Sequence, residues 1–155
     1  MNEKMDNYFK LAAEATIKGI DNNEGGPFGA TIVRDGEVVV AVGNTMMRDT
    51  DPSAHAEMVA VREACKKLET MDLSDCEIYA TCEPCPMCVS VIIWSGIKKV
   101  YYANTAKDAD EKGFTDMHLR SYLNGKDKSV LDMVNVEKRA DCDHLFDYFD
   151  EKNKE

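Results

Sequence analysis

Apolar residues recur along the chain at spacings that predict a helix followed by a β-hairpin. Over residues 4–20 they repeat with the period of an amphipathic helix that packs on one face. The β-rich runs Phe28–Arg34 and Glu37–Gly43 flank the pair Asp35-Gly36, which is typical of a tight hairpin turn. The first part of the chain is therefore expected to form one helix and two antiparallel strands.

Helices and strands alternate in the rest of the chain. The pattern predicts helices at 52–69, 83–94, 116–123 and 143–151, and strands at 77–81, 99–103 and 133–138. Asp51 is expected to cap the first of these helices, with Pro52 at its first position and a polar loop over residues 44–51 before it. This order predicts an α/β fold of three layers, α/β/α, with a central mixed sheet of five strands.

The length and composition of the chain fit a single folded domain over residues 1–155. The 155 residues are 44% apolar and 31% charged, which is ordinary for a globular domain. The start has no apolar signal core, and the longest strongly apolar run, residues 89–94, is far too short to span a bilayer. We therefore expect a cytoplasmic protein with no membrane partner, whose six cysteines are thiols or metal ligands rather than disulfides.

The net charge of −10 argues against a nucleic-acid partner. A polyanion such as RNA is repelled unless basic residues cluster on one face. The longest basic stretches are only pairs, Lys66-Lys67 and Lys98-Lys99. The charge balance therefore favours a small-molecule substrate.

Two short motifs contain residues of the types that bind zinc. They are His55-Ala56-Glu57 and Pro84-Cys85-Pro86-Met87-Cys88, and the pattern H-x-E…P-C-x-x-C is the signature of zinc nucleobase deaminases. Cys85 and Cys88 are three residues apart at the start of a predicted helix, so both sulfurs lie on one face. With His55 they supply three ligands for Zn²⁺ and leave one position for water, as catalytic sites do.

Glu57 supplies a proton carrier for this site. In sites of this kind zinc lowers the pKa of bound water to about 7. A carboxylate two residues from the histidine ligand can take a proton from the water, give it to a ring nitrogen and later protonate the leaving amine. An amidine-type carbon that bears an exocyclic amine is the electrophile that suits this chemistry.

Cys82 leaves a non-enzymatic alternative open. The spacing Cys82-x-x-Cys85-x-x-Cys88 offers three thiolates, which with His55 would form a closed structural zinc site, or with another cysteine an iron–sulfur site. Such a protein would be a zinc-binding interaction module. A closed site leaves Glu57 without a role, so we favour the catalytic reading.

The motifs resemble those of the cytidine-deaminase-like superfamily and, within it, the bacterial guanine deaminases. The resemblance covers about residues 5–123, and its matching stretches are Gly25–Ala30, Gly43-Asn44, Asp51–Glu57, Cys82–Cys88, Trp94 and Asp108–Asp116. It implies hydrolytic deamination of a free base, with guanine converted to xanthine and ammonia as the first expectation. Cytosine deaminase and tRNA adenosine deaminase are the alternatives within the superfamily.

The resemblance also implies roles for individual residues around the metal. Asn44 matches a residue whose amide hydrogen-bonds the base, Phe28 and Trp94 match aromatic pocket walls, and Ala56 is counted among the substrate-binding residues. Asp116 matches a second acid that assists the departure of ammonia. The structural alternatives are a turn former for Asn44, core packing for the aromatic residues and a helix cap for Asp116.

Relatives of this kind are commonly dimers that exchange the C-terminal segment. The resemblance therefore implies a homodimer in which residues from about 125–155 cross to the partner and close its pocket. The residues that compete to complete the pocket are Glu137, Asp141, Asp143, Tyr148 and Phe149. The sequence departs from the family pattern at Thr115, where an acid is frequent, and it ends without a terminal aromatic residue.

Overall fold

The computed structural model describes residues 3–136 and 140–154. The chain forms two compact units, Met1–Arg120 and Ser121–Glu155, and each is described by itself. In the described part of the chain, no helix combines the length and the apolar character that crossing a membrane would require.

A mixed sheet of four strands forms the centre of the first unit. The strands are β1 (Gly29–Arg34), β2 (Glu37–Gly43), β3 (Cys76–Cys82) and β4 (Val100–Asn104). Their order in the sheet is β2-β1-β3-β4; β1 is antiparallel to both β2 and β3, while β3 and β4 are parallel. The sheet is therefore mixed, as predicted.

The hairpin between β1 and β2 forms where the sequence predicts it. Asp35 and Gly36 both have positive φ angles, 51° and 79°, which is the backbone that a tight hairpin turn with the twist of its strands requires. Val33 pairs with Val38 although Ile32 pairs with Val40, so one extra residue bulges from β2.

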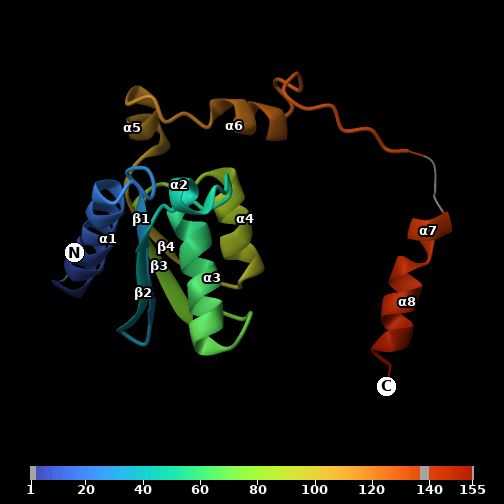
Figure 1. The fold of residues 1–155 in the computed structure, drawn as a ribbon, viewed down its shortest axis with the longest axis horizontal. Coiled ribbons are helices and arrows are strands. Elements are labelled where there is room, and N and C mark those ends of the chain that lie inside the picture. The colour runs from blue at the N-terminus through green and yellow to red at the C-terminus, as the bar shows by residue number, and fades with distance from the viewer. Residues whose placement is uncertain (1–2, 137–139, 155) are drawn as a thin grey trace. The chain divides into compact units, whose positions relative to one another are not determined.

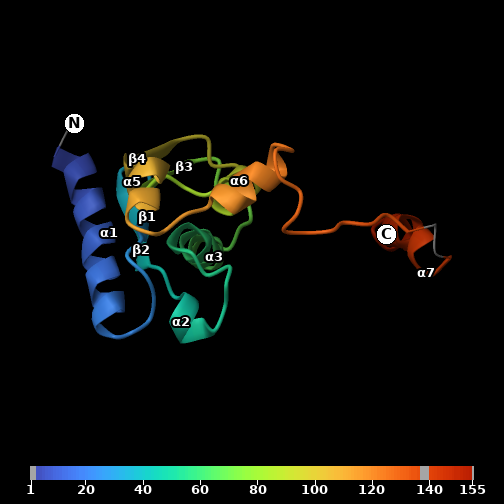
Figure 2. The same cartoon turned by 90° about the horizontal axis from the view of Figure 1, so that it is seen from above.

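Helices cover both faces of the sheet. Figures 1 and 2 show α1 (Glu3–Asp21) on one face and α3 (Ala56–Leu68) on the other, with α4 (Pro86–Trp94) packed beside α3. The shorter helices are α2 (Met46–Asp49), α5 (Ala106–Glu111) and α6 (Met117–Leu123), followed in the second unit by α7 (Ala140–Asp143) and α8 (Leu145–Lys152). This arrangement confirms the predicted α/β fold with helices on both sides of a mixed sheet.

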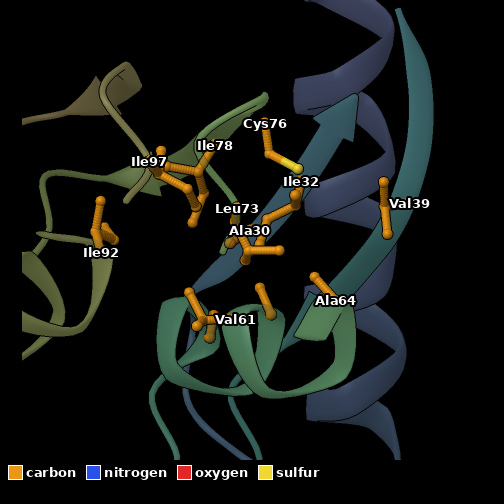
Figure 3. Close-up of a cluster of buried hydrophobic side chains, with 12 residues drawn as sticks. Ala30, Ile32, Val39, Val61, Ala64, Leu73, Cys76, Ile78, Ile92 and Ile97 are labelled. Carbon is orange, nitrogen blue, oxygen red and sulfur yellow. The ribbon is translucent and has the colours of Figure 1, made fainter. Parts of the chain in front are cut away.

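The main core lies between the sheet and helices α3 and α4. Ile32 and Ile78 project from β1 and β3 into this layer and are fully buried (Figure 3). Ala60 and Ala64 on α3 are also fully buried, and their small side chains let the helix approach the sheet closely. A smaller cluster that includes Tyr8 and its neighbours packs α1 on the opposite face. These contacts fix where α3 begins relative to the sheet.

The sheet of the described residues has four strands, so the expectation of five strands was wrong. Residues 133–136 adopt no regular structure, and residues 137–138 of the predicted strand lie outside the described residues. The segment is rich in β-branched and apolar residues, but Met133, Val134 and Val136 are exposed. Strand propensity depends on packing and on a hydrogen-bonding partner strand. Residues 133–136 have neither.

The start of α3 also differs from the prediction. Asp51 does not cap the helix, because its carboxylate accepts hydrogen bonds from the backbone N–H and the hydroxyl of Ser53, at 2.8 and 2.7 Å. This local turn keeps residues 52–54 out of the helix. His55 becomes the N-cap residue instead, and the expected polar loop before it contains the short helix α2.

Replacement of Ile32 by Ala tests the core. Because Ile32 is fully buried, we expect Ile32→Ala to lower the free energy of unfolding by about 2–5 kcal/mol. Ile17→Ala is the control, since Ile17 is 59% exposed on α1, and its effect should stay within about 0.5 kcal/mol. Urea denaturation followed by circular dichroism measures both. Equal losses in the two variants would contradict this description of the core.

Candidate active site

The N-termini of α3 and α4 present three metal-binding side chains to one point. His55 is the N-cap residue of α3, Cys85 is the N-cap residue of α4, and Cys88 lies in the first turn of α4. The Nδ1 atom of His55 lies 3.6 Å from the Sγ atom of Cys85 and 3.6 Å from that of Cys88. The three ligand atoms all lie within 4.8 Å of one another.

This geometry fits a tetrahedral zinc ion. Zinc binds sulfur at about 2.3 Å and imidazole nitrogen at about 2.0–2.1 Å, so a tetrahedral angle separates the two ligand atoms by about 3.6 Å. The observed N–S distances of 3.6 Å match that value. Two thiolates and one imidazole also form a donor set that zinc prefers.

Hydrogen bonding within the cluster favours ionisation of one thiol. The Cys88 thiol donates to Cys85, and this bond, helped by His55, lowers the pKa of Cys85 to about 4. The same bond, together with burial, raises the pKa of Cys88. The hydrogen bond to Cys85 raises the pKa of His55. The positive ends of the two helix dipoles favour the thiolate further.

Glu57 lies in the first turn of α3 next to this cluster. Its side chain is buried, with 7% of the residue exposed, and burial raises the pKa of its carboxyl group. A carboxylate that binds a proton more readily than usual is a better general base, and as the acid it can return that proton later.

Cys82 does not belong to the metal-binding cluster. Its thiol donates to the backbone oxygen of Thr105, with 3.6 Å between sulfur and oxygen. Burial raises the pKa of this thiol. Among the described residues, the candidate ligand group contains His55, Cys85 and Cys88 without Cys82. The closed site with three cysteines is therefore not formed.

A cavity of about 260 Å³ adjoins the metal-binding residues. The residues that line it are Phe28, Asn44, Met46, His55, Glu57, Cys82, Glu83, Cys85, Ala106, Ala109, Phe114, Thr115 and Asp116. The rings of Phe28 and Phe114 meet edge to face, with their centroids 5.4 Å apart. Three carboxylates line the cavity, and among its described lining residues there is neither Lys nor Arg.

Hydrogen bonds to its amide oxygen fix the side chain of Asn44 in the wall of the cavity. That oxygen accepts hydrogen bonds from the backbone N–H of Met46, at 3.0 Å, and of Gly26, at 3.4 Å. A side chain at Gly25 would overlap both the backbone and the amide oxygen of Asn44, so glycine is required there for steric reasons. With its oxygen engaged, Asn44 has its amide N–H groups left to donate to a ligand.

Asp116 lines the cavity and pairs with Arg120, which lies one helical turn later in the same chain. The Nε atom of Arg120 donates to the Asp116 carboxylate at 2.9 Å. This hydrogen bond raises the pKa of the Arg120 guanidinium. The carboxylate of Glu83, also in the lining, accepts a hydrogen bond from the backbone N–H of Ala106 at 3.0 Å.

Not every predicted site residue reaches the cavity. His55, Glu57, Cys85, Asn44, Phe28 and Asp116 line it, and Cys88 is buried beside them. Ala56 is fully buried between His55 and Glu57 but is not part of the lining. Trp94 lies at the end of α4 with 87% of its surface exposed and does not line the cavity of its own chain. The period of α4 turns Trp94 to the side opposite the buried Ile92.

Several lining residues were not predicted as site residues. They are Met46, Cys82, Glu83, Ala106, Ala109, Phe114 and Thr115. Glu83, Phe114 and Thr115 lie inside the matching stretches, so the motifs contained a signal for them. Met46 and Ala106 begin α2 and α5, which the sequence pattern did not predict.

The C-terminal candidates belong to a different part of the chain. Asp141 and Asp143 lie on α7, and Tyr148 and Phe149 lie on α8, in the second unit. Glu137 lies outside the described residues. A role for any of these residues at the cavity stays a prediction.

Metal analysis of two cysteine variants tests the ligand set. We expect Cys85→Ser to lose most of its zinc, because removal of one of three protein ligands weakens a metal site strongly. Cys82→Ser is the matched control and should retain zinc, since its sulfur bonds to Thr105 instead. Zinc content after dialysis, measured by mass spectrometry, separates them. Loss of zinc in Cys82→Ser would contradict the three-ligand assignment.

Comparison with known proteins agrees with this geometry. The chain is 45% identical over 109 residues to a guanine deaminase from Bacillus subtilis, covering 70% of each chain. It is 40% identical over 96 residues to a tRNA-specific adenosine deaminase from Aquifex aeolicus, covering 62% of this chain and 63% of the relative. The X-ray structure of guanine deaminase from Bacillus subtilis matches with a TM-score of 0.85 and 36% identity, over 99% of this chain and 95% of that chain.

A family model also matches the chain to the zinc-dependent deaminases. The model for the cytidine and deoxycytidylate deaminase zinc-binding region matches residues 2–104, which contain all three metal-binding residues and Glu57. The family resemblance that the two motifs indicated is therefore confirmed. Zinc is the metal that the cluster of His55, Cys85 and Cys88 binds. The chain belongs to the zinc-dependent deaminase family that is defined by the cytidine and deoxycytidylate deaminase zinc-binding region.

Proposed function

We propose that this enzyme hydrolyses guanine to xanthine and ammonia. The observation that carries the proposal is the composition of the cavity beside the zinc ligands. Glu57, Glu83 and Asp116 line it together with aromatic rings, and its described lining contains neither Lys nor Arg. The similarity to guanine deaminases over most of the chain supports the same substrate.

The charge of the cavity disfavours substrates that carry phosphate. Carboxylates repel phosphate groups, and no Lys or Arg in the described lining compensates for this repulsion. A nucleotide or the anticodon loop of tRNA would need such contacts. A neutral free base avoids this cost.

Among free bases, guanine offers the hydrogen-bond donors that this cavity can accept. Guanine has a ring N–H and an exocyclic amine on adjacent positions, as well as an imidazole N–H. Asp116 and Glu83 supply acceptors, and the amide of Asn44 supplies a donor for a ring nitrogen or carbonyl oxygen of the base. Phe28 and Phe114 provide apolar surfaces for the flat ring. Cytosine is smaller and has fewer donors to pair with the acidic lining.

The reaction replaces one carbon–nitrogen bond by a carbon–oxygen bond. Water adds to C2 of guanine, the bond from C2 to the exocyclic nitrogen breaks, and xanthine and ammonia leave. His55, Cys85 and Cys88 would hold the zinc ion, which when bound would supply Lewis acidity and lower the pKa of its bound water to about 7. Glu57 accepts the proton of the attacking water, delivers it to the ring nitrogen beside C2, and transfers the next proton to the leaving amine.

Two further residues orient the base in this proposal. Asn44 donates from an amide whose oxygen is already engaged by backbone N–H groups, so its donor direction is set before substrate arrives. Asp116 accepts a hydrogen bond from the amine that will depart. Pre-set groups of this kind favour the transition state because they need no reorganisation during the reaction.

A substrate panel tests the proposal directly. Purified protein with zinc would be offered guanine, cytosine, adenine, cytidine and tRNA, and ammonia release would be followed. We expect guanine to give the highest kcat/KM, by at least ~10²-fold, because hydrogen-bonding sites reject analogues that leave polar groups unpaired. Faster turnover of cytosine or of tRNA would overturn the assignment of guanine.

Two variants of α3 test whether Glu57 carries the proton. Glu57→Gln should retain zinc and lose at least ~10² of turnover, because the amide cannot carry the proton. Glu63→Gln, on the exposed side of the same helix, is the matched control and should behave as the wild type. Full activity of Glu57→Gln would show that another group carries the proton.

We further propose that the protein is a homodimer that exchanges residues from about 125–155 between copies. Apolar side chains of the second unit are exposed, with Phe146 at 83% and Met133 at 75%. Ile93 and Trp94 are likewise exposed on α4 of the first unit. Apolar surface of this extent is typical of contacts between subunits. A closing segment from the partner would also exclude water from the cavity.

Light scattering after size exclusion tests the dimer. We expect a mass of twice 17.4 kDa, with Ile93→Asp shifted toward the monomer because the charge disrupts an apolar contact. A mass of 17.4 kDa for the wild type at micromolar concentration would contradict the proposal.

The state of the cysteines supports a cytoplasmic location, which we propose as well. None of the six forms a disulfide in the described residues, and two of them, Cys85 and Cys88, are zinc ligands. Free thiols and a thiolate zinc site are typical of a reducing compartment.

A further inference from the structure

Arg120 lies just outside the acidic cavity and contacts two of the segments that form it. Its Nε atom donates to Oδ1 of Asp116 at 2.9 Å. Its guanidinium also donates to the backbone oxygen of Pro84 at 3.5 Å and lies 3.9 Å from the carboxylate of Glu83. The same cation thus contacts two of the three carboxylates that line the cavity, those of Asp116 and Glu83.

These contacts join two parts of the chain that are distant in sequence. Asp116 and Arg120 belong to the segment around the start of α6, whereas Glu83 and Pro84 form the loop between β3 and α4 that ends at Cys85. The guanidinium therefore couples the position of Asp116 to the loop that carries a zinc ligand. All four residues lie in the first unit.

The chemistry of the guanidinium suits this bridging position. Arginine presents several N–H donors in a rigid plane, so it can hold a carboxylate and a backbone oxygen at the same time. The side chains of Arg120 and Asp116 are 33% and 25% exposed, so solvent screens the pair only in part. An acid four residues before an arginine at a helix start is also a favourable arrangement.

Resting on the proposed function, we propose that Arg120 is a positioning residue that orients the Asp116 carboxylate toward the substrate amine and fastens the start of α6 to the Cys85 loop. Arg120 does not line the cavity, so it acts through Asp116 rather than on the substrate. When the Arg120 guanidinium is removed, the Asp116 carboxylate remains but is free to rotate away from the substrate. A displacement of about 1 Å in a group that contacts the reacting atoms can cost up to roughly 10² in rate.

A double-mutant cycle between Arg120 and Asp116 tests this inference. Arg120→Met keeps much of the aliphatic stem and removes the charge, and we expect it to lower kcat/KM by roughly 10- to 100-fold with zinc retained. In the background of Asp116→Asn, measured by single turnover with excess enzyme, Arg120→Met should cause no further loss. A purely structural role for Arg120 would lower the rate by the same factor in both backgrounds, and that result would overturn the proposal.

Arg34→Met is the matched control for the loss of a surface ion pair. Arg34 lies 4.0 Å from Asp75 at the far end of β1 from Phe28, and its replacement should leave kcat/KM unchanged. Wild-type activity of Arg120→Met would likewise overturn the inference.

Hydrogen exchange gives a readout that does not depend on catalysis. We expect faster amide exchange over residues 114–120 in Arg120→Met and no such change in Arg34→Met. Unchanged exchange in that segment would show that Arg120 does not hold it. If the wild type fails to deaminate guanine, the proposed substrate is wrong, and the cycle is then run with the base of the panel that the wild type does turn over.

Discussion

The site depends on the convergence of two helix N-termini at one point beside the sheet. His55 is the N-cap residue of α3 and Cys85 that of α4. The distances of 3.6 Å from the His55 nitrogen to the Cys85 and Cys88 sulfurs are those of a tetrahedral zinc site. The core holds this convergence in place, because both helices pack on the same face of the sheet through buried residues such as Ala60 and Ile92. A shift of either helix would separate the ligands.

The same edge of the sheet supplies most of the cavity. Phe28 precedes β1, Asn44 follows β2, Cys82 ends β3 and Ala106 follows β4. Because β1 is antiparallel to β2 and β3 while β3 and β4 are parallel, these four chain ends meet at one edge. This is the edge where ligands bind in many α/β sheets. The mixed order of the strands therefore decides which residues can share a pocket.

The acidic character of the cavity comes from the side chains that line it and not from the net charge of the chain. Burial beside two thiols makes Glu57 a better proton acceptor, while the lining places two further carboxylates where a donor-rich base can meet them. Arg120 contacts these two carboxylates from outside the lining. The cavity can thus stay acidic toward a ligand while the acids themselves are held in place by a cation.

The sequence by itself determined the metal chemistry and most of the framework. The signature H-x-E…P-C-x-x-C predicted the ligand set and the proton carrier. Within each half of it, Cys85 with Cys88 and His55 with Glu57, the residues lie within one helical turn of each other. The helix over 4–20 and the hairpin at Asp35-Gly36 were predicted for the same reason, since local periodicity and turn chemistry do not depend on distant contacts.

Only the tertiary structure decided the remaining features. The exclusion of Cys82 from the cluster, the exposure of Trp94 and the absence of a strand at 133–136 each depend on which surfaces meet in space. The bridge from Arg120 to Pro84 joins positions 36 residues apart, and no local pattern encodes such a contact. A motif specifies chemistry that neighbouring residues share, whereas packing decides which distant side chains surround it.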